Sequence, residues 1–63
     1  MKVIIFSENT RDGLEVDWPA IPAIGSYVRF DHRGGTDNLE VKSADWNVDT
    51  DGLFDHVELR LSF

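Results

Sequence analysis

The sequence predicts an all-β protein, a five-stranded antiparallel meander curled into a small barrel. Apolar and polar residues alternate with a period of two over most of the 63 residues. Two Asp-Gly pairs separate alternating runs, as is typical of hairpin turns. No stretch has a convincing helical pattern. Because a chain of this length holds a single hydrophobic core, residues 1–63 are expected to form one domain.

The first two predicted strands form a hairpin. Residues 1–7 are apolar on both faces, whereas residues 14–18 alternate cleanly and place Trp18 on the inner side. Asp12 and Gly13 lie between them and predict the turn. Trp18 and, further along, Trp46 are expected in the core, because aromatic residues of so short a chain usually pack there.

Residues 19–25 contain two prolines and cannot form an interior strand, since proline has no amide donor. We expect an extended connection whose Ile21 and Ile24 pack at the edge of the core. The third strand follows at residues 26–31, with Val28 and Phe30 inward and Tyr27 outward.

The fourth strand changes its pattern partway along. After a turn at residues 32–37 with paired glycines, residues 39–42 alternate, but Ala44, Trp46 and Val48 lie on the other parity. Either a bulge near Ser43 resets the register or the strand bends sharply there.

The fifth strand follows a second Asp-Gly turn at residues 49–52. It alternates clearly, with its inward side made of Val57, Leu59, Leu61 and Phe63.

The segment Pro22-Ala23-Ile24-Gly25-Ser26-Tyr27-Val28 resembles the Pro-x-x-Gly-x-x-Val entry into a strand of Src-homology-3-like small barrels. The end of the chain, with a strand ending in Trp46, an Asp-Gly turn and an alternating last strand, is similar to the same group. It also resembles short uncharacterised all-β bacterial or mobile-element proteins. The resemblance implies a small barrel and not an activity. Peptide-binding members use a cluster of surface aromatics, and only Tyr27 and Trp46 could serve here.

Composition excludes several functions. Twelve acidic residues against six basic ones give a net charge of −6, which would repel a nucleic acid. Without cysteine there is no thiol chemistry, and a reducing, cytoplasmic location is expected. No apolar run is long enough for a membrane span. His32 and His56 have no nucleophile beside them, so an enzyme is not expected and no catalytic residue or cofactor is assigned.

One segment resembles a calcium loop. Residues 47–58 place oxygen ligands at the spacing of an EF-hand, with a glycine at the sixth position; the ligands would be Asn47, Asp49, Asp51, Asp55 and Glu58. An EF-hand needs a helix after the loop, and here the residues after it alternate as a strand. A hairpin is therefore favoured, and a weak Ca²⁺-binding hairpin remains an alternative.

The first strand suggests an interface. One of its faces must carry Ile4 and Phe6, and an exposed pair beside Tyr27 would be an apolar patch. Either residues 19–25 cover that face or the protein forms a homodimer through it.

The sequence thus predicts a non-catalytic protein-interaction or structural module that binds a protein partner or itself. The main alternative is an acidic decoy from a mobile element that blocks a basic, nucleic-acid-binding host protein. That hypothesis requires acids grouped on one face, such as Glu15, Asp17 and Glu40.

Overall fold

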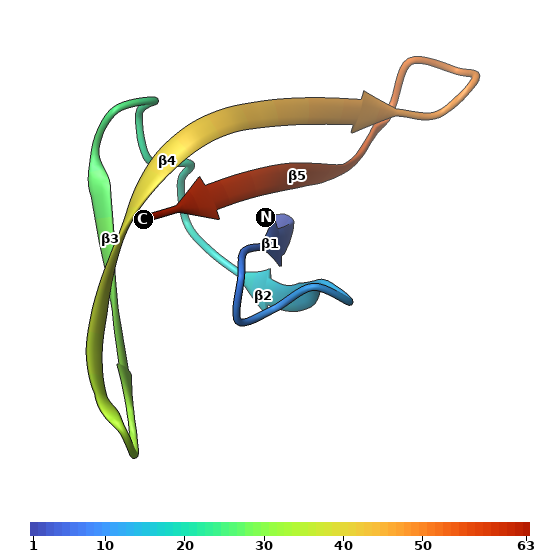
Figure 1. Ribbon diagram of the computed structural model, residues 1–63. Coiled ribbons are helices and arrows are strands. Elements are labelled where there is room, and N and C mark those ends of the chain that lie inside the picture. Colours follow the sequence, from blue (N-terminus) through green and yellow to red (C-terminus); the bar gives the residue numbers. More distant parts are fainter.

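The computed structural model describes the backbone of residues 1–63 and every side chain except that of His32. It confirms the all-β prediction. The five strands are β1 (Lys2–Phe6), β2 (Leu14–Asp17), β3 (Tyr27–His32), β4 (Gly35–Val48) and β5 (Phe54–Ser62) (Figure 1). No helix in the described chain is long and apolar enough to cross a membrane.

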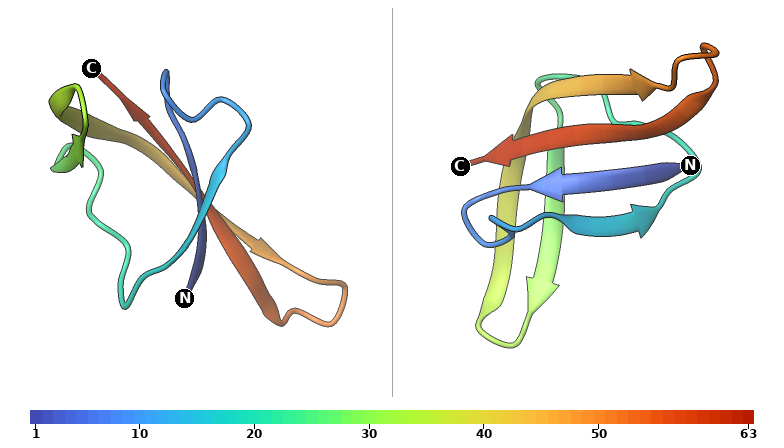
Figure 2. Two further views of the ribbon diagram at one scale, coloured as in Figure 1. Left: turned by 90° about the horizontal axis from the view of Figure 1, so that it is seen from below. Right: turned by 90° about the vertical axis from the view of Figure 1, so that its right-hand side faces the viewer.

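The strand order corrects the predicted meander. The strands form one sheet in the order β2-β1-β5-β4-β3, with β1 parallel to β5 and every other pair antiparallel. Because β1 carries apolar side chains on both faces, it takes a central position with a neighbour on each side. The connection after β2 then carries the chain to the opposite edge of the sheet (Figure 2).

The sheet is a curled half-barrel and not a closed barrel, since β2 and β3 remain its two edges. Its parallel pair does not belong to an antiparallel meander, and a Src-homology-3-like topology is not confirmed.

The core lies on the inner face of the curl. Six of its buried residues form one cluster: Val3, Ile5, Leu39, Val41, Leu59 and Leu61. Ile21 packs against this cluster, as predicted, but Ile24 is 68% exposed. The amide of Gly25 already donates to the carbonyl of Val41, so the chain has rejoined the sheet by this point and leaves Ile24 outside.

The predicted irregularity near Ser43 is confirmed as a β-bulge. Val41 lies opposite Leu61 and Ser43 lies opposite Arg60, so one extra residue is inserted in β4. Bulges increase the local bend of a strand. On one side of this bulge β4 pairs with β3, and on the other it extends along β5 alone (Figure 1).

Two predicted boundaries shift. Pairing of β3 with β4 continues to His32 and Gly35, so this turn is tighter than expected. Phe63 lies beyond the end of β5 and is 69% exposed instead of packed on the inner face.

Candidate protein-docking surface

The hairpin made by the end of β4 and the start of β5 projects away from the rest of the sheet (Figure 1). We call residues 43–59 the distal arm; its base, at residues 57–59, pairs with β1 and belongs to the core, and the part beyond that base projects. Pairing between β3 and β4 ends at Tyr27 and Glu40, and two further backbone hydrogen bonds join Val41 to Gly25 and Ser26. Beyond Val41, within the chain as the structure describes it, β4 pairs with β5 alone. One edge of the distal arm is therefore open.

Apolar side chains on the distal arm are exposed. Trp46 is 58% exposed and Phe54 43%, and their rings meet edge-to-face with centroids 5.7 Å apart. Val48 and Leu53 are also largely exposed. Directly paired residues share a face of a sheet, so Trp46 lies on the same side as its buried partner Val57.

This placement corrects the expectation that Trp46 belongs to the core. Its face is the inner one, as the alternation indicates, but the neighbouring strand β1 pairs with β5 only from Val57 onward. The aromatic pair therefore lies past the point where the core ends.

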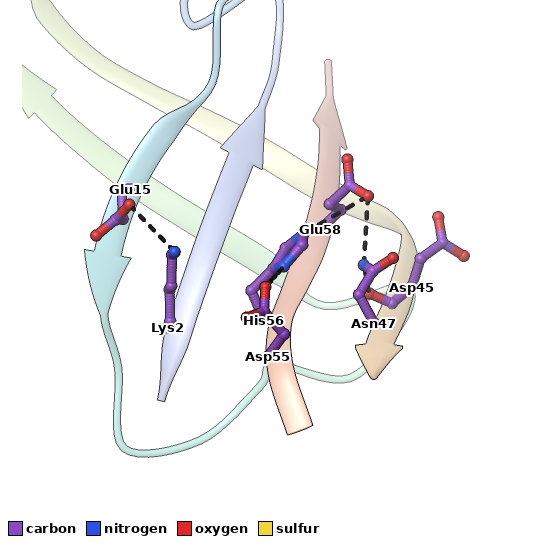
Figure 3. Close-up of polar contacts among 7 residues, drawn as sticks. All are labelled: Lys2, Glu15, Asp45, Asn47, Asp55, His56 and Glu58. Carbon is purple, nitrogen blue, oxygen red and sulfur yellow. Dashed lines mark hydrogen bonds and ion pairs between the residues drawn. The ribbon is translucent and has the colours of Figure 1, made fainter. Parts of the chain in front are cut away.

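The opposite face of the distal arm is polar (Figure 3). The side-chain amide of Asn47 donates to a carboxylate oxygen of Glu58 at 3.3 Å. His56 lies between two acids, with Nδ1 2.6 Å from Asp55 and Nε2 3.8 Å from Glu58. The distal arm holds five acidic residues and neither lysine nor arginine. It therefore combines an apolar face with a polar face that carries negative charge.

Four of the five side chains that match the calcium-loop pattern have partners within the protein. The Oδ1 atom of Asp49 accepts hydrogen bonds from the amides of Asp51 and Leu53, both at 2.9 Å, and so closes the turn. Asp55 pairs with His56, and Asn47 with Glu58. Among the described side chains, no group of three His, Cys, Asp or Glu is placed to hold a metal ion.

Asp49 is expected to act as a turn residue. Asp49→Ala should lower the free energy of unfolding by about 1 kcal/mol, because two backbone amides lose their acceptor. Asp51→Ala should change it by less than about 0.5 kcal/mol. Urea denaturation with and without millimolar Ca²⁺ checks both values. Stabilisation by Ca²⁺ that disappears in both variants would instead show a metal site.

Asp55 gives a prediction about pH. The hydrogen bond with His56 holds the pKa of the Asp55 carboxyl below its ordinary value. A carboxyl whose pKa is lower in the folded than in the unfolded state stabilises the fold at pH values above the unfolded-state pKa. This contribution is lost as the pH falls through the folded-state pKa. An NMR titration should find the lowered pKa in the wild type and its return towards about 3.9 in His56→Ala.

The structure separates the residues of the interaction surface predicted from the sequence, Ile4, Phe6 and Tyr27. Val3 and Ile5 face the core, so Ile4 and Phe6 lie on the outer face, where both are half-buried. The guanidinium of Arg60 covers the Phe6 ring at 5.2 Å. Tyr27 is 69% exposed, but it lies on β3, which β5 and β4 separate from β1. These three residues do not form one patch.

The acids proposed for a decoy surface have cationic neighbours. Glu15 lies 3.8 Å from Lys2, and Glu40 lies 3.2 Å from Lys42. Asp17 accepts a hydrogen bond from the N-terminal ammonium at 2.8 Å. The largest concentration of negative charge is on the distal arm, where Lys2 of β1 acts on one acid, Asp55. Sequence reasoning missed this concentration. The available signal was the absence of lysine and arginine over residues 43–59.

The distal arm thus offers an open strand edge, an exposed apolar face and an acidic polar face. The register between β4 and β5 determines where the side chains and backbone groups responsible for all three features lie. Comparisons with protein-family models, with curated proteins and with solved structures found no match.

Proposed function

We propose that the protein is a cytoplasmic, non-catalytic protein-interaction module whose contact surface is the distal arm. The observation that carries the proposal is the exposure of four neighbouring apolar residues at the hairpin end: Trp46, Val48, Leu53 and Phe54. An exposed apolar cluster on a small domain favours an interface, and tryptophan is among the residue types enriched in the few positions that dominate binding energy.

The charge of the distal arm predicts the chemistry of the partner. Five carboxylates without lysine or arginine attract a basic surface and accelerate its encounter with the arm. The same field repels nucleic acid. We therefore propose a basic protein as the partner.

The acidic-decoy hypothesis is a second candidate, favoured by the same charge concentration. It adds the requirement that the partner is itself a nucleic-acid-binding protein. A partner that loses its hold on DNA or RNA when this protein is added would support the decoy. If the partner still binds DNA or RNA in the presence of this protein, the decoy hypothesis is wrong and the general interaction module stands.

Photo-crosslinking tests the proposed surface. A benzophenone amino acid replaces Trp46 in one variant and Tyr27 in a matched control, because both are exposed aromatic residues on different strands. In cells of the source organism, irradiation should link the first variant to a discrete protein and leave the second free. Equal labelling at both positions, or none at either, would contradict the proposal.

A covalent dimer of this chain would identify the partner as a second copy and revive the homodimer hypothesis. Sedimentation velocity then gives the independent check, since a self-associating protein increases in mass with concentration.

A further inference from the structure

We infer that the open edge of β4 at residues 43–48 accepts an extended segment of alternating basic and apolar residues as an additional strand. This inference rests on the proposed function and deepens it, because it names how the partner binds and what its sequence must look like. It follows from the backbone pairing, the side chains on the two faces and the charge of the distal arm.

The edge itself comes from the register. In an antiparallel pair every second residue turns its amide and carbonyl away from the partner strand. Along residues 43–48 the backbone groups that face β5 bond to it. In the part of the chain that the structure describes, no strand lies beside the groups that face outward, since pairing with β3 ends at Glu40. Such an edge is a template for a further strand, a recurring mode of peptide recognition.

The two faces of the edge differ in chemistry. Trp46 and Val48 lie on the inner side and are 58% and 61% exposed. Asp45, paired with Glu58, lies on the outer side together with Asn47. Neighbouring strands bring side chains on the same face within about 5 Å. An added strand would therefore place alternate residues against Trp46 and Val48 and the others against Asp45 and Asn47, with the Glu58 carboxylate one strand further away on the same side.

This arrangement favours a basic segment over a second copy of the chain. Pairing of two distal arms would bring together two segments with five acids each and no lysine or arginine. Like charges on adjacent strands are destabilising. A segment that alternates lysine or arginine with apolar residues satisfies both faces at once.

The probe is an acetylated and amidated peptide of alternating lysine and valine, about as long as the edge. In an NMR titration it should shift the amides of residues 43–48 and protect the outward ones from exchange. The peptide with glutamate in place of lysine should not bind.

Two N-methylated versions of this peptide test the strand geometry. One carries methyl groups on the backbone nitrogens of the lysines, and the other on the backbone nitrogens of the valines. In an added strand only one of these sets faces β4, so one version should bind at least about tenfold more weakly and the other should keep its affinity. If both bind as well as the parent peptide, strand addition is wrong, although docking on the distal arm stands.

A charge reversal supplies the matched variant. Asp45→Lys should weaken binding of the lysine–valine peptide several-fold, whereas Asp12→Lys, in the β1–β2 turn, makes the same change in net charge far from the edge and should have little effect. Equal effects would reduce the interaction to net charge and overturn the inference. Absence of any binding by the parent peptide would also overturn it. The proposed function would still be tested separately, by the crosslinking at Trp46.

Discussion

Leu59→Ala is expected to lower the free energy of unfolding by about 2–5 kcal/mol. Leu59 is fully buried on the central strand β5, between Ile5 on β1 and Ala44 on β4. Alanine would leave a cavity that the two flanking strands cannot close. At roughly 0.05–0.15 kcal/mol per residue, a domain of 63 residues has a total stability of roughly 3–9 kcal/mol. The variant should therefore lose at least about a fifth of the stability of the domain, and at the upper end of the range all of it.

Leu53→Ala is the matched control, because it removes the same atoms from a side chain that is 64% exposed. It should cost less than about 0.5 kcal/mol. Urea denaturation followed by tryptophan fluorescence measures both variants. Similar losses of stability at the two positions would contradict the core described above.

Gly13→Ala is the second substitution with a large expected effect. Gly13 has a φ of +88°, a region in which alanine is strained. A Cβ atom there would also lie 2.9 Å from Cγ2 of Ile4 and 3.2 Å from Cε1 of Phe6. The Ile4 methyl belongs to a stiff, β-branched side chain, and the Phe6 ring is held under Arg60. Strain and clash together should cost about 2–4 kcal/mol.

Gly52→Ala separates the two causes. Gly52 has a φ of +80° in the distal arm, and a Cβ atom there would meet open space. It should cost only the backbone strain, about 1–2 kcal/mol. If thermal or urea denaturation gave equal losses for the two glycines, the close packing of the β1–β2 turn against β1 would be wrong.

The local parts of this fold can be predicted from the sequence. Alternation locates the five strands, and the change of parity between Val41 and Ala44 locates the bulge. Asp-Gly pairs predict two of the hairpins, because glycine adopts the positive φ that these turns require. All of these signals lie within a few residues of the feature they predict.

The strand order could not be obtained in this way. The parallel pairing of β1 with β5 joins the two ends of the chain, for example Val3 to Val57. Nothing in the alternation of either strand specifies its partner. The apolar character of both faces of β1 was the one hint of a central strand, and it predicted an exposed face equally well.

The docking surface was missed for a related reason. Alternation placed Trp46 on the inner face correctly, but burial depends on whether another element covers that position. Coverage stops at Val57, where the pairing of β5 with β1 begins, and this depends on the strand order. The face of a side chain is a local property, whereas its exposure is a property of the whole sheet.

Amide hydrogen exchange along the distal arm tests the central claim most directly. An open edge predicts that protection alternates over residues 43–48, with slow exchange for amides bonded to β5 and fast exchange for those that face outward. Amides of β5 at residues 57–60, which lie between two strands, should all be protected. Uniform protection of residues 43–48, equal to that of residues 57–60, would show that the edge is already covered and would contradict the account.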